Sequence, residues 1–208
     1  MAEAGLRERK KLATRVALGQ AAWRLVMERG YDKVRVEDVA AAAGVSVRTF
    51  SNYFTNKDQA LLSIGEDRGQ RIVAALRARP PEEDLWEALA VATAGQFTGE
   101  GEVPRDPGIA SAYSASLAAA QRRLHVAIEA ALATAIAERT GTDAERDLYP
   151  RLVAAVTVSA TQTALDYWCR ADGRPGEDTA AGEPFAAFLR RVLRQVASGL
   201  PQPANDRA

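Results

Sequence analysis

The sequence is poor in the residues that build disulfide frameworks, metal clusters and histidine-dependent active sites. Its 208 residues include a single cysteine, Cys169, and a single histidine, His125. These counts argue against a disulfide scaffold, a zinc cluster and a Cys/His catalytic dyad, so we expect no metal and no cofactor. Long apolar runs are also missing. Without a run of about 18 uncharged apolar residues or an apolar signal segment, we expect a cytoplasmic protein without a membrane partner.

The formal net charge is zero, but the charges are unevenly distributed along the chain. Residues 1–79 hold 15 Lys/Arg against 9 Asp/Glu, whereas residues 80–208 hold 12 against 18. A basic amino-terminal third beside an acidic remainder indicates a polyanionic partner for the first part.

The distribution of helix-forming and helix-breaking residues predicts an all-α protein. Alanine, leucine and arginine dominate long stretches, and the β-branched residues are too scattered to form strands. Gly30 is expected to stop the first helix and Pro80-Pro81 the fourth. The predicted helices span residues 9–29, 36–43, 46–54, 57–79, 82–97, 107–119, 121–139, 144–171 and 182–199, and fusion or breaking of some helices after residue 82 is left open.

The segment from Val36 to Lys57 has the pattern of a helix-turn-helix. Gly44 supplies the turn, where a positive φ disfavours residues that carry a side chain. Ser46 is placed to cap the second helix, and Phe50 and Phe54, four residues apart, are expected to face inward.

The opposite side of this second helix suits a DNA groove. It carries Arg48 and Asn52, flanked by Thr49 and Ser51, and it has no carboxylate that would repel phosphates. Nine residues at about 1.5 Å each give a helix of about 13 Å, comparable with the major-groove width of about 12 Å.

The same stretch resembles the TetR/AcrR family of bacterial transcriptional regulators over about residues 9–60. The resemblance implies a three-helix DNA-binding domain at residues 1–57 and a larger helical effector-binding and dimerisation domain at 58–200. We expect residues 201–208 to form a disordered tail. The resemblance depends on the order of Gly30-Tyr31, Val39-Ala40, Ala43-Gly44-Val45-Ser46, Thr49-Phe50, Tyr53-Phe54 and Asn56-Lys57.

The resemblance also implies roles for individual residues in DNA binding. Residues near base edges are Val47, Arg48, Thr49 and Ser51, and residues near phosphates are Arg35, Asn52, Tyr53 and Lys57. Arg48 is the leading base reader, because a guanidinium pairs bidentately with guanine O6 and N7. Arg35 stands where the family commonly has a capping Thr or Ser, so it is expected to contact a phosphate but not to cap the helix.

The second half of the chain has no phosphate loop, metal-ligand spacing or nucleophile-base signature, so we do not expect an enzyme. The family resemblance implies a cavity for a small hydrophobic or amphipathic effector, although ordinary core packing is an equally good account of any one candidate. Lone His125 is interpreted as a surface or core residue, and Cys169, beside Trp168, as a buried small hydrophobe or a partly exposed thiol without an activating neighbour. The candidate effector-binding residues are Trp86, Phe97, Tyr113, Leu117, Thr161, Gln162 and Tyr167.

Two helices of the second half are candidates for a homodimer interface. Ala155, Ser159 and Thr163 repeat at four-residue spacing, with Ala160 and Ala164 alongside, which would allow close approach of a second helix. For both helices, packing within one subunit is the alternative. The last predicted helix carries a wide apolar stripe of Phe185, Phe188, Leu189, Val192, Leu193 and Val196.

Together these features predict a ligand-responsive, sequence-specific regulator that binds double-stranded DNA as a homodimer. We expect a repressor that a small hydrophobic effector releases from a palindromic operator. A helical small-molecule carrier or adaptor without DNA binding, and a small helical enzyme that uses His125, are the alternatives. Only the regulator should bind DNA with an affinity that falls steeply as salt rises.

Overall fold

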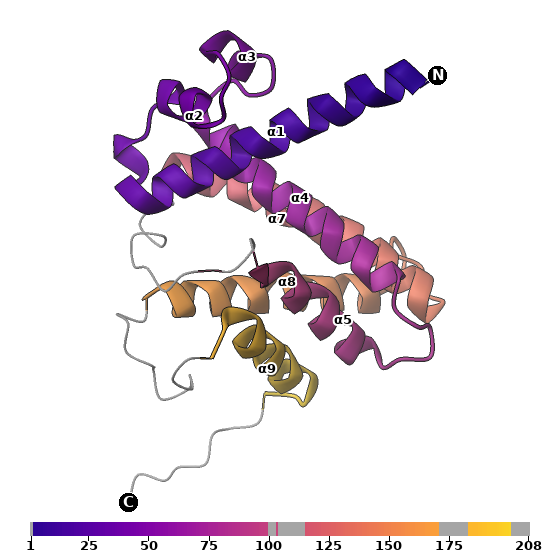
Figure 1. Cartoon of the computed structure of the whole chain (residues 1–208). Coiled ribbons are helices and arrows are strands. Elements are labelled where there is room, and N and C mark those ends of the chain that lie inside the picture. Colours follow the sequence, from indigo (N-terminus) through magenta and orange to yellow (C-terminus); the bar gives the residue numbers. More distant parts are fainter. Residues whose placement is uncertain (1, 100–102, 104–114, 171–182, 201–208) are drawn as a thin grey trace, which may run out of the picture. The chain divides into compact units, whose positions relative to one another are not determined.

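The computed structural model describes residues 2–99, 103, 115–170 and 183–200, and all regular elements in these ranges are helical (Figure 1). The prediction of an all-α protein is therefore confirmed. None of these helices combines the length and the apolar character that crossing a bilayer requires. The α-helices are α1 (Ala2–Arg29), α2 (Val36–Ala42), α3 (Val47–Ser51), α4 (Lys57–Arg77), α5 (Leu85–Ala94), α7 (Ala115–Thr140), α8 (Leu148–Arg170) and α9 (Phe185–Ala197), with short 3₁₀ helices η1 (Tyr31–Lys33) and η2 (Gly95–Phe97).

The chain folds as two compact units. The first consists of residues 1–69 and 106–126, and the second of residues 70–105 and 127–208. Helices α4 and α7 each supply residues to both units. The functional domain boundaries expected after residues 57 and 200 stay a prediction, and the expected disordered tail lies outside the described residues.

The first unit has a core formed by α1, α2, the α3 segment and the start of α4. Leu18 and Leu25 of α1 are buried against Val39 of α2 and Phe50 of α3. Helix α1 ends because Gly30 adopts a φ of 83°, a conformation that glycine reaches without steric cost. This core fixes the orientation of the short helices α2 and α3.

The second unit has its own core of residues from α4, α5, α7 and α8, and α9 packs against α5 and α8. Leu76, Leu89, Leu132 and Ile136 are almost fully buried within it. An aromatic cluster extends this core: Phe185 of α9 contacts Phe97 edge-on at 5.0 Å and Trp168 at 5.4 Å between ring centroids.

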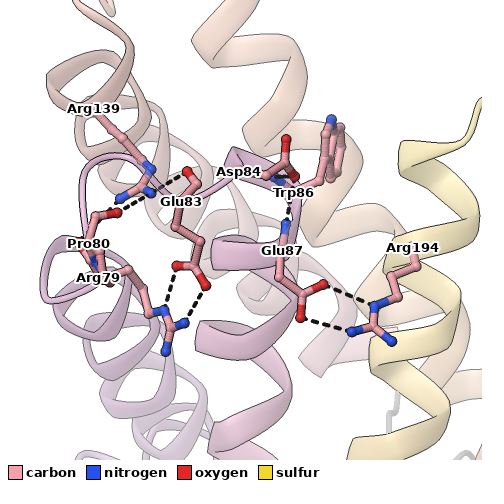
Figure 2. A network of polar contacts seen from close by, with 8 residues as sticks. All are labelled: Arg79, Pro80, Glu83, Asp84, Trp86, Glu87, Arg139 and Arg194. Atoms are coloured by element: carbon pink, nitrogen blue, oxygen red, sulfur yellow. Dashed lines mark hydrogen bonds and ion pairs between the residues drawn. The ribbon is translucent and has the colours of Figure 1, made fainter.

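A polar network secures the connection between α4 and α5 (Figure 2). Arg139 of α7 donates to the carbonyl oxygens of Pro80 at 2.5 Å and Glu83 at 2.6 Å, and the Glu83 carboxylate pairs with Arg79. Farther along, Glu87 of α5 receives two hydrogen bonds from Arg194 of α9, at 3.0 and 2.9 Å. The network therefore links α5 and its preceding turn to both α7 and α9.

Several predicted helix boundaries differ from the structure; α1 begins at Ala2 instead of 9, and α5 begins at Leu85 instead of 82. Helix α3 covers Val47–Ser51 instead of 46–54, because the chain tightens at its end and Tyr53 N–H donates to the Phe50 carbonyl oxygen. Helix α7 runs without a break through residue 120, so the predicted helices 107–119 and 121–139 are fused at this point. Helix α8 begins at Leu148 instead of 144, because the Asp143 carboxylate holds the preceding turn. Residues 107–114 of a predicted helix lie outside the described residues.

Candidate nucleic-acid interface

A tight turn at Gly44 joins α2 to α3. Gly44 has a φ of 69°, and the next residue, Val45, donates from its backbone N–H to the Ala40 carbonyl oxygen at 2.9 Å. A residue with a Cβ would be strained at this φ. The predicted helix-turn-helix, with glycine at the turn, is thus confirmed.

The first turn of α3 is fixed by a side-chain cap. The Ser46 hydroxyl oxygen accepts a hydrogen bond from the Thr49 backbone N–H at 3.1 Å, as the sequence predicted. The two hydroxyl oxygens of these residues are also 2.9 Å apart. The cap sets the residue at which α3 begins and hence which side chains face outward.

Two phenylalanines anchor α3 from its inner side. Phe50 is 1% exposed and Phe54 is 5% exposed, and their ring centroids lie 5.7 Å apart. Both belong to the core that α1 and α2 build. The prediction that these rings face inward is confirmed, and the opposite side of α3 is left facing solvent.

The outward side of α3 presents the four residues expected near base edges. Val47, Arg48 and Ser51 are exposed, and Thr49 is half-buried. The Ser51 hydroxyl donates to the Val47 carbonyl oxygen at 3.0 Å, so its remaining capacity is to accept. Among the described residues, no hydrogen bond or ion pair engages the Arg48 guanidinium. We call the exposed face formed by Val47, Arg48, Thr49 and Ser51 the recognition ridge. Arg48 offers the largest set of free hydrogen-bond donors on it.

The predicted phosphate contacts surround this ridge. Asn52 is exposed directly after α3, and Tyr53 is half-buried with its ring against the core. Arg35 is exposed at the start of α2, where the Asp38 carboxylate accepts the Arg35 backbone N–H at 2.9 Å. Asp38 thus satisfies the backbone N–H of Arg35, a role that sequence reasoning had not assigned to it.

Lys57, the last predicted phosphate contact, lies in the first turn of α4 with its side chain turned toward the protein. Its ammonium donates to the carbonyl oxygens of Tyr31 at 2.7 Å and Val34 at 3.1 Å. The Tyr31 hydroxyl donates to the neighbouring Asp58 carboxylate. The contact between Lys57 and Tyr31 was not predicted from the sequence, although Gly30-Tyr31 and Asn56-Lys57 both belong to the pattern that resembles the family.

The start of α4 is capped by reciprocal hydrogen bonds. The Asn56 carboxamide oxygen accepts the Gln59 backbone N–H at 2.9 Å, and the Gln59 carboxamide oxygen accepts the Thr55 backbone N–H at the same distance. These two bonds satisfy donors that a helix terminus otherwise leaves unpaired. They hold the chain that leads from the recognition ridge into α4.

The candidate effector-binding residues are only partly brought together. Phe97 is 3% exposed and contacts Phe185, whereas Tyr167 is 39% exposed and stacks on Phe188 at 5.8 Å. Trp86 is half-buried in the first turn of α5.

The polar candidates are engaged within their own helix. The Thr161 hydroxyl donates to the Thr157 carbonyl oxygen at 2.8 Å, and the Gln162 amide to the Asp166 carboxylate at 3.0 Å. Tyr113 lies outside the described residues. Leu117 belongs to α7, but its side chain is also outside the description. That these residues converge on one cavity stays a prediction.

Sequence reasoning missed Trp168 as a member of the aromatic cluster, in which it contacts Phe185 and Phe188. Trp168 is 3% exposed, and its indole N–H donates to the Val103 carbonyl oxygen at 3.0 Å. The sequence signal for Trp168 was its position next to Cys169, for which burial was one of the two interpretations. Cys169 is 1% exposed.

In α5, the hydroxyl oxygen of Thr93 is buried without a hydrogen-bond partner among the described residues.

The residues expected at a dimer interface divide into two groups. Phe185, Phe188, Leu189 and Leu193 of α9 are buried within the subunit, so intramolecular packing accounts for most of that apolar stripe. On α8, Ser159 and Thr163 are exposed. They share this helix with two exposed leucines, Leu148 and Leu152, which are 74% and 53% exposed.

No group of three or more His, Cys, Asp or Glu side chains capable of holding a metal ion occurs in the part of the chain that the structure describes. His125 is half-buried on α7.

Comparison with known proteins finds a matching family model for each half of the sequence. Residues 19–64 match the family model described as bacterial regulatory proteins of the tetR family, and residues 111–201 match the MftR C-terminal domain. The HTH-type transcriptional regulator TcmR of Streptomyces glaucescens is 31% identical over 186 residues, which cover 81% of this chain and 79% of that protein.

Solved structures share the fold at lower sequence identity. A putative TetR-family regulator from Syntrophomonas wolfei is 18% identical, with a TM-score of 0.64 over 92% of this chain and 98% of that one. The fatty acid degradation regulator FadR of Bacillus halodurans is 19% identical, with a TM-score of 0.62 over 91% and 97% of the respective chains. At these identities the likeness concerns the fold.

Proposed function

The chain belongs to the TetR family of bacterial regulatory proteins and is a transcriptional regulator; from that premise we propose that it is an effector-released repressor that binds a palindromic operator as a homodimer. The observation that carries the proposal is the ridge on α3. This ridge is capped by Ser46, anchored from behind by Phe50 and Phe54, and presents Arg48 with its guanidinium free.

In the proposed complex, α3 lies in the major groove and Arg48 reads a guanine through O6 and N7. Val47, which is 41% exposed, meets a thymine methyl group, while Thr49 and Ser51 supply hydroxyls to nearby base edges. These contacts confer sequence preference because each base pair presents a distinct pattern of groups in this groove.

Arg35, Asn52, Tyr53 and Lys57 bind the sugar-phosphate backbone in this proposal. Contacts of this kind fix the register of the protein on the duplex without distinguishing sequences. The Lys57 ammonium keeps one N–H donor for a phosphate, because two of its three donors are held by backbone carbonyl oxygens.

We assign the dimer interface to α8. Leu148, Leu152, Ser159 and Thr163 recur at spacings of four and seven residues, so they lie on one side of the helix, and all four are exposed in the single subunit. Covering this stripe with the same stripe of a second copy removes apolar surface from water. A two-fold dimer then presents its two recognition helices about 34 Å apart, one turn of DNA.

For the effector we propose a hydrophobic or amphipathic small molecule bound by the second compact unit. The apolar and aromatic character of its core supports this class. Two structural relatives are described as FadR of Bacillus subtilis in complex with stearoyl-CoA and FadR of Thermus thermophilus in complex with lauroyl-CoA. The effector releases DNA only to the extent that it binds the DNA-incompetent arrangement more tightly.

The test is selection of bound duplexes from a random pool, followed by titration of the selected duplex at several salt concentrations. The proposal expects a near-palindromic motif and an affinity that falls steeply with salt, because phosphate contacts release counterions. A carrier, an adaptor or an enzyme that uses His125 would select no motif. Mass spectrometry of small molecules that copurify with the protein then identifies the chemical class of the effector.

A further inference from the structure

Arg15 of α1 joins two carboxylates of α4 within the first compact unit. Its Nη1 atom lies 2.8 Å from Asp67 Oδ1, and its Nη2 atom lies 2.6 Å from Glu66 Oε2. The side chains of Arg15 and Asp67 are only 29% and 18% exposed. A guanidinium held by two acceptors has a fixed orientation, unlike the ammonium of a lysine.

The same guanidinium also contacts the segment that carries the recognition ridge. Its central carbon lies 5.7 Å from the centroid of the Phe54 ring, and Phe54 contacts Phe50 of α3 at 5.7 Å. A cation over an aromatic face adds an attraction of its own. Arg15 thus completes a continuous series of contacts from Glu66 and Asp67 to α3.

The neighbouring turns of α1 and α4 are packed closely enough to make this contact rigid. A Cβ at Gly19, one turn after Arg15, would lie 2.7 Å from the Ser63 hydroxyl oxygen and 3.2 Å from the Ala60 carbonyl oxygen. Ser63 itself is 1% exposed. Because α1 and α4 approach each other without an intervening side chain, Arg15 reaches Asp67 across a short and fixed distance.

Assuming the proposed function, we infer that Arg15 is a positioning residue that sets the angle between α3 and α4 and thereby the spacing of the two recognition helices in the dimer. An isolated surface ion pair contributes little to stability. Here one guanidinium is shared by two carboxylates and an aromatic ring, so its removal frees the recognition ridge to turn relative to α4.

The test compares Arg15→Met, which keeps much of the apolar stem but removes the charge, with Arg24→Met as a matched control. Arg24 is an exposed arginine of the same helix that has no ion pair among the described residues. Affinity is measured on the selected duplex and on one whose half-sites lie one base pair farther apart. A third variant, Asp67→Asn, and its combination with Arg15→Met complete a double-mutant cycle.

For Arg15→Met we expect an affinity about three- to tenfold lower on the selected duplex and a smaller penalty for the longer spacing. The slope of affinity against salt should match that of Arg24→Met, because neither arginine is assigned a phosphate. Asp67→Asn should cause a similar loss, and the double variant no further loss. If Arg15→Met instead binds both duplexes as the control does, or loses affinity equally on both, the inference is wrong.

A second readout does not require DNA. Amide hydrogen exchange in the free protein should be faster across residues 46–54 in Arg15→Met than in the unaltered chain or in Arg24→Met. Unchanged exchange in this segment would overturn the inference. If the unaltered chain selects no duplex, the proposed function fails, and the exchange measurement still decides whether Arg15 holds the recognition ridge.

Discussion

The ammonium group of Lys57 lies 3.8 Å from the centroid of the Tyr31 ring and donates to the carbonyl oxygen of that same residue. With a second hydrogen bond to the Val34 carbonyl oxygen, it ties the first turn of α4 to the connection between α1 and α2. A lysine that the sequence assigned to phosphate binding is therefore also part of the fold of the DNA-binding unit.

Replacing Lys57 by methionine should consequently affect both stability and DNA binding. Loss of hydrogen bonds from a charged group lowers the free energy of unfolding by about 1.5 to 3 kcal/mol, measured by urea denaturation. Affinity should fall by a similar factor for all duplex sequences, because a phosphate contact carries no base preference. Lys33→Met, at an exposed lysine, is the control. An unchanged urea midpoint for Lys57→Met would contradict the structural role.

Arg48→Ala should change base preference rather than stability. The side chain is exposed and engages no described residue, so its removal leaves the unfolding transition close to that of the unaltered chain. Loss of a bidentate guanine contact costs about 1 to 3 kcal/mol of discrimination at one half-site position. Duplex selection should return a motif degenerate at that position. Recovery of the original motif would show that Arg48 does not read a base.

Ser46→Ala removes the cap of α3. Substitutions of this kind lower stability by about 1 kcal/mol, and the fraying of α3 should weaken binding to the selected duplex as well. Ser51→Ala is a suitable comparison for stability alone, because the Ser51 hydroxyl bonds back to the Val47 carbonyl oxygen within the same helix and caps nothing. Equal urea midpoints for the two variants would contradict the importance of the cap.

The features of the site that could be predicted from sequence arise from interactions between near neighbours. The Ser46 cap spans three residues, the pair Phe50 and Phe54 spans four, and the positive φ of Gly44 is a property of one residue. Amino-acid type and spacing suffice for such features. The same local information predicted helix 46–54 too long, because hydroxyl and amide side chains at its end support several conformations.

Interactions between residues far apart in the sequence could not be predicted from the periodicity of apolar residues. Arg139 bonds to the Pro80 carbonyl oxygen across 59 positions, and Lys57 reaches Tyr31 across 26. An amphipathic pattern likewise does not identify its partner. The sequence left two accounts of the apolar stripe of α9 open, a dimer interface and packing within one subunit, and Phe185 and Leu193 are buried by helices of the same subunit.

The ion pair between Glu87 and Arg194 predicts a dependence of stability on acid. Hydrogen bonds from Arg194 hold the pKa of the Glu87 carboxyl below its ordinary value of about 4.5. A carboxyl whose pKa is lowered on folding stabilises the native state above the ordinary value and loses that contribution as pH falls through the folded value. Urea midpoints should therefore drop less between about pH 5 and pH 3 in Arg194→Gln than in the unaltered chain.

Arg151→Gln is the matched control for this acid effect. Arg151 is exposed and has no ion pair among the described residues, so its replacement should leave the acid dependence of the urea midpoint unchanged. If Arg194→Gln and Arg151→Gln show the same acid dependence, the pair with Glu87 does not contribute to stability.

The exposed stripe of α8 gives the dimer its own test. Leu152 is 53% exposed in the single subunit, and a carboxylate at this position in a symmetric interface would face its own copy or apolar surface. Leu152→Glu should therefore shift the mass measured by light scattering from twice 22.3 kDa to the mass of one chain. Leu12→Glu, at a leucine of α1 that is 58% exposed, should leave the dimer intact. Because a monomer contacts one half-site, Leu152→Glu should also abolish the dependence of affinity on half-site spacing. A Leu152→Glu protein that stays dimeric would exclude this face of α8 from the interface.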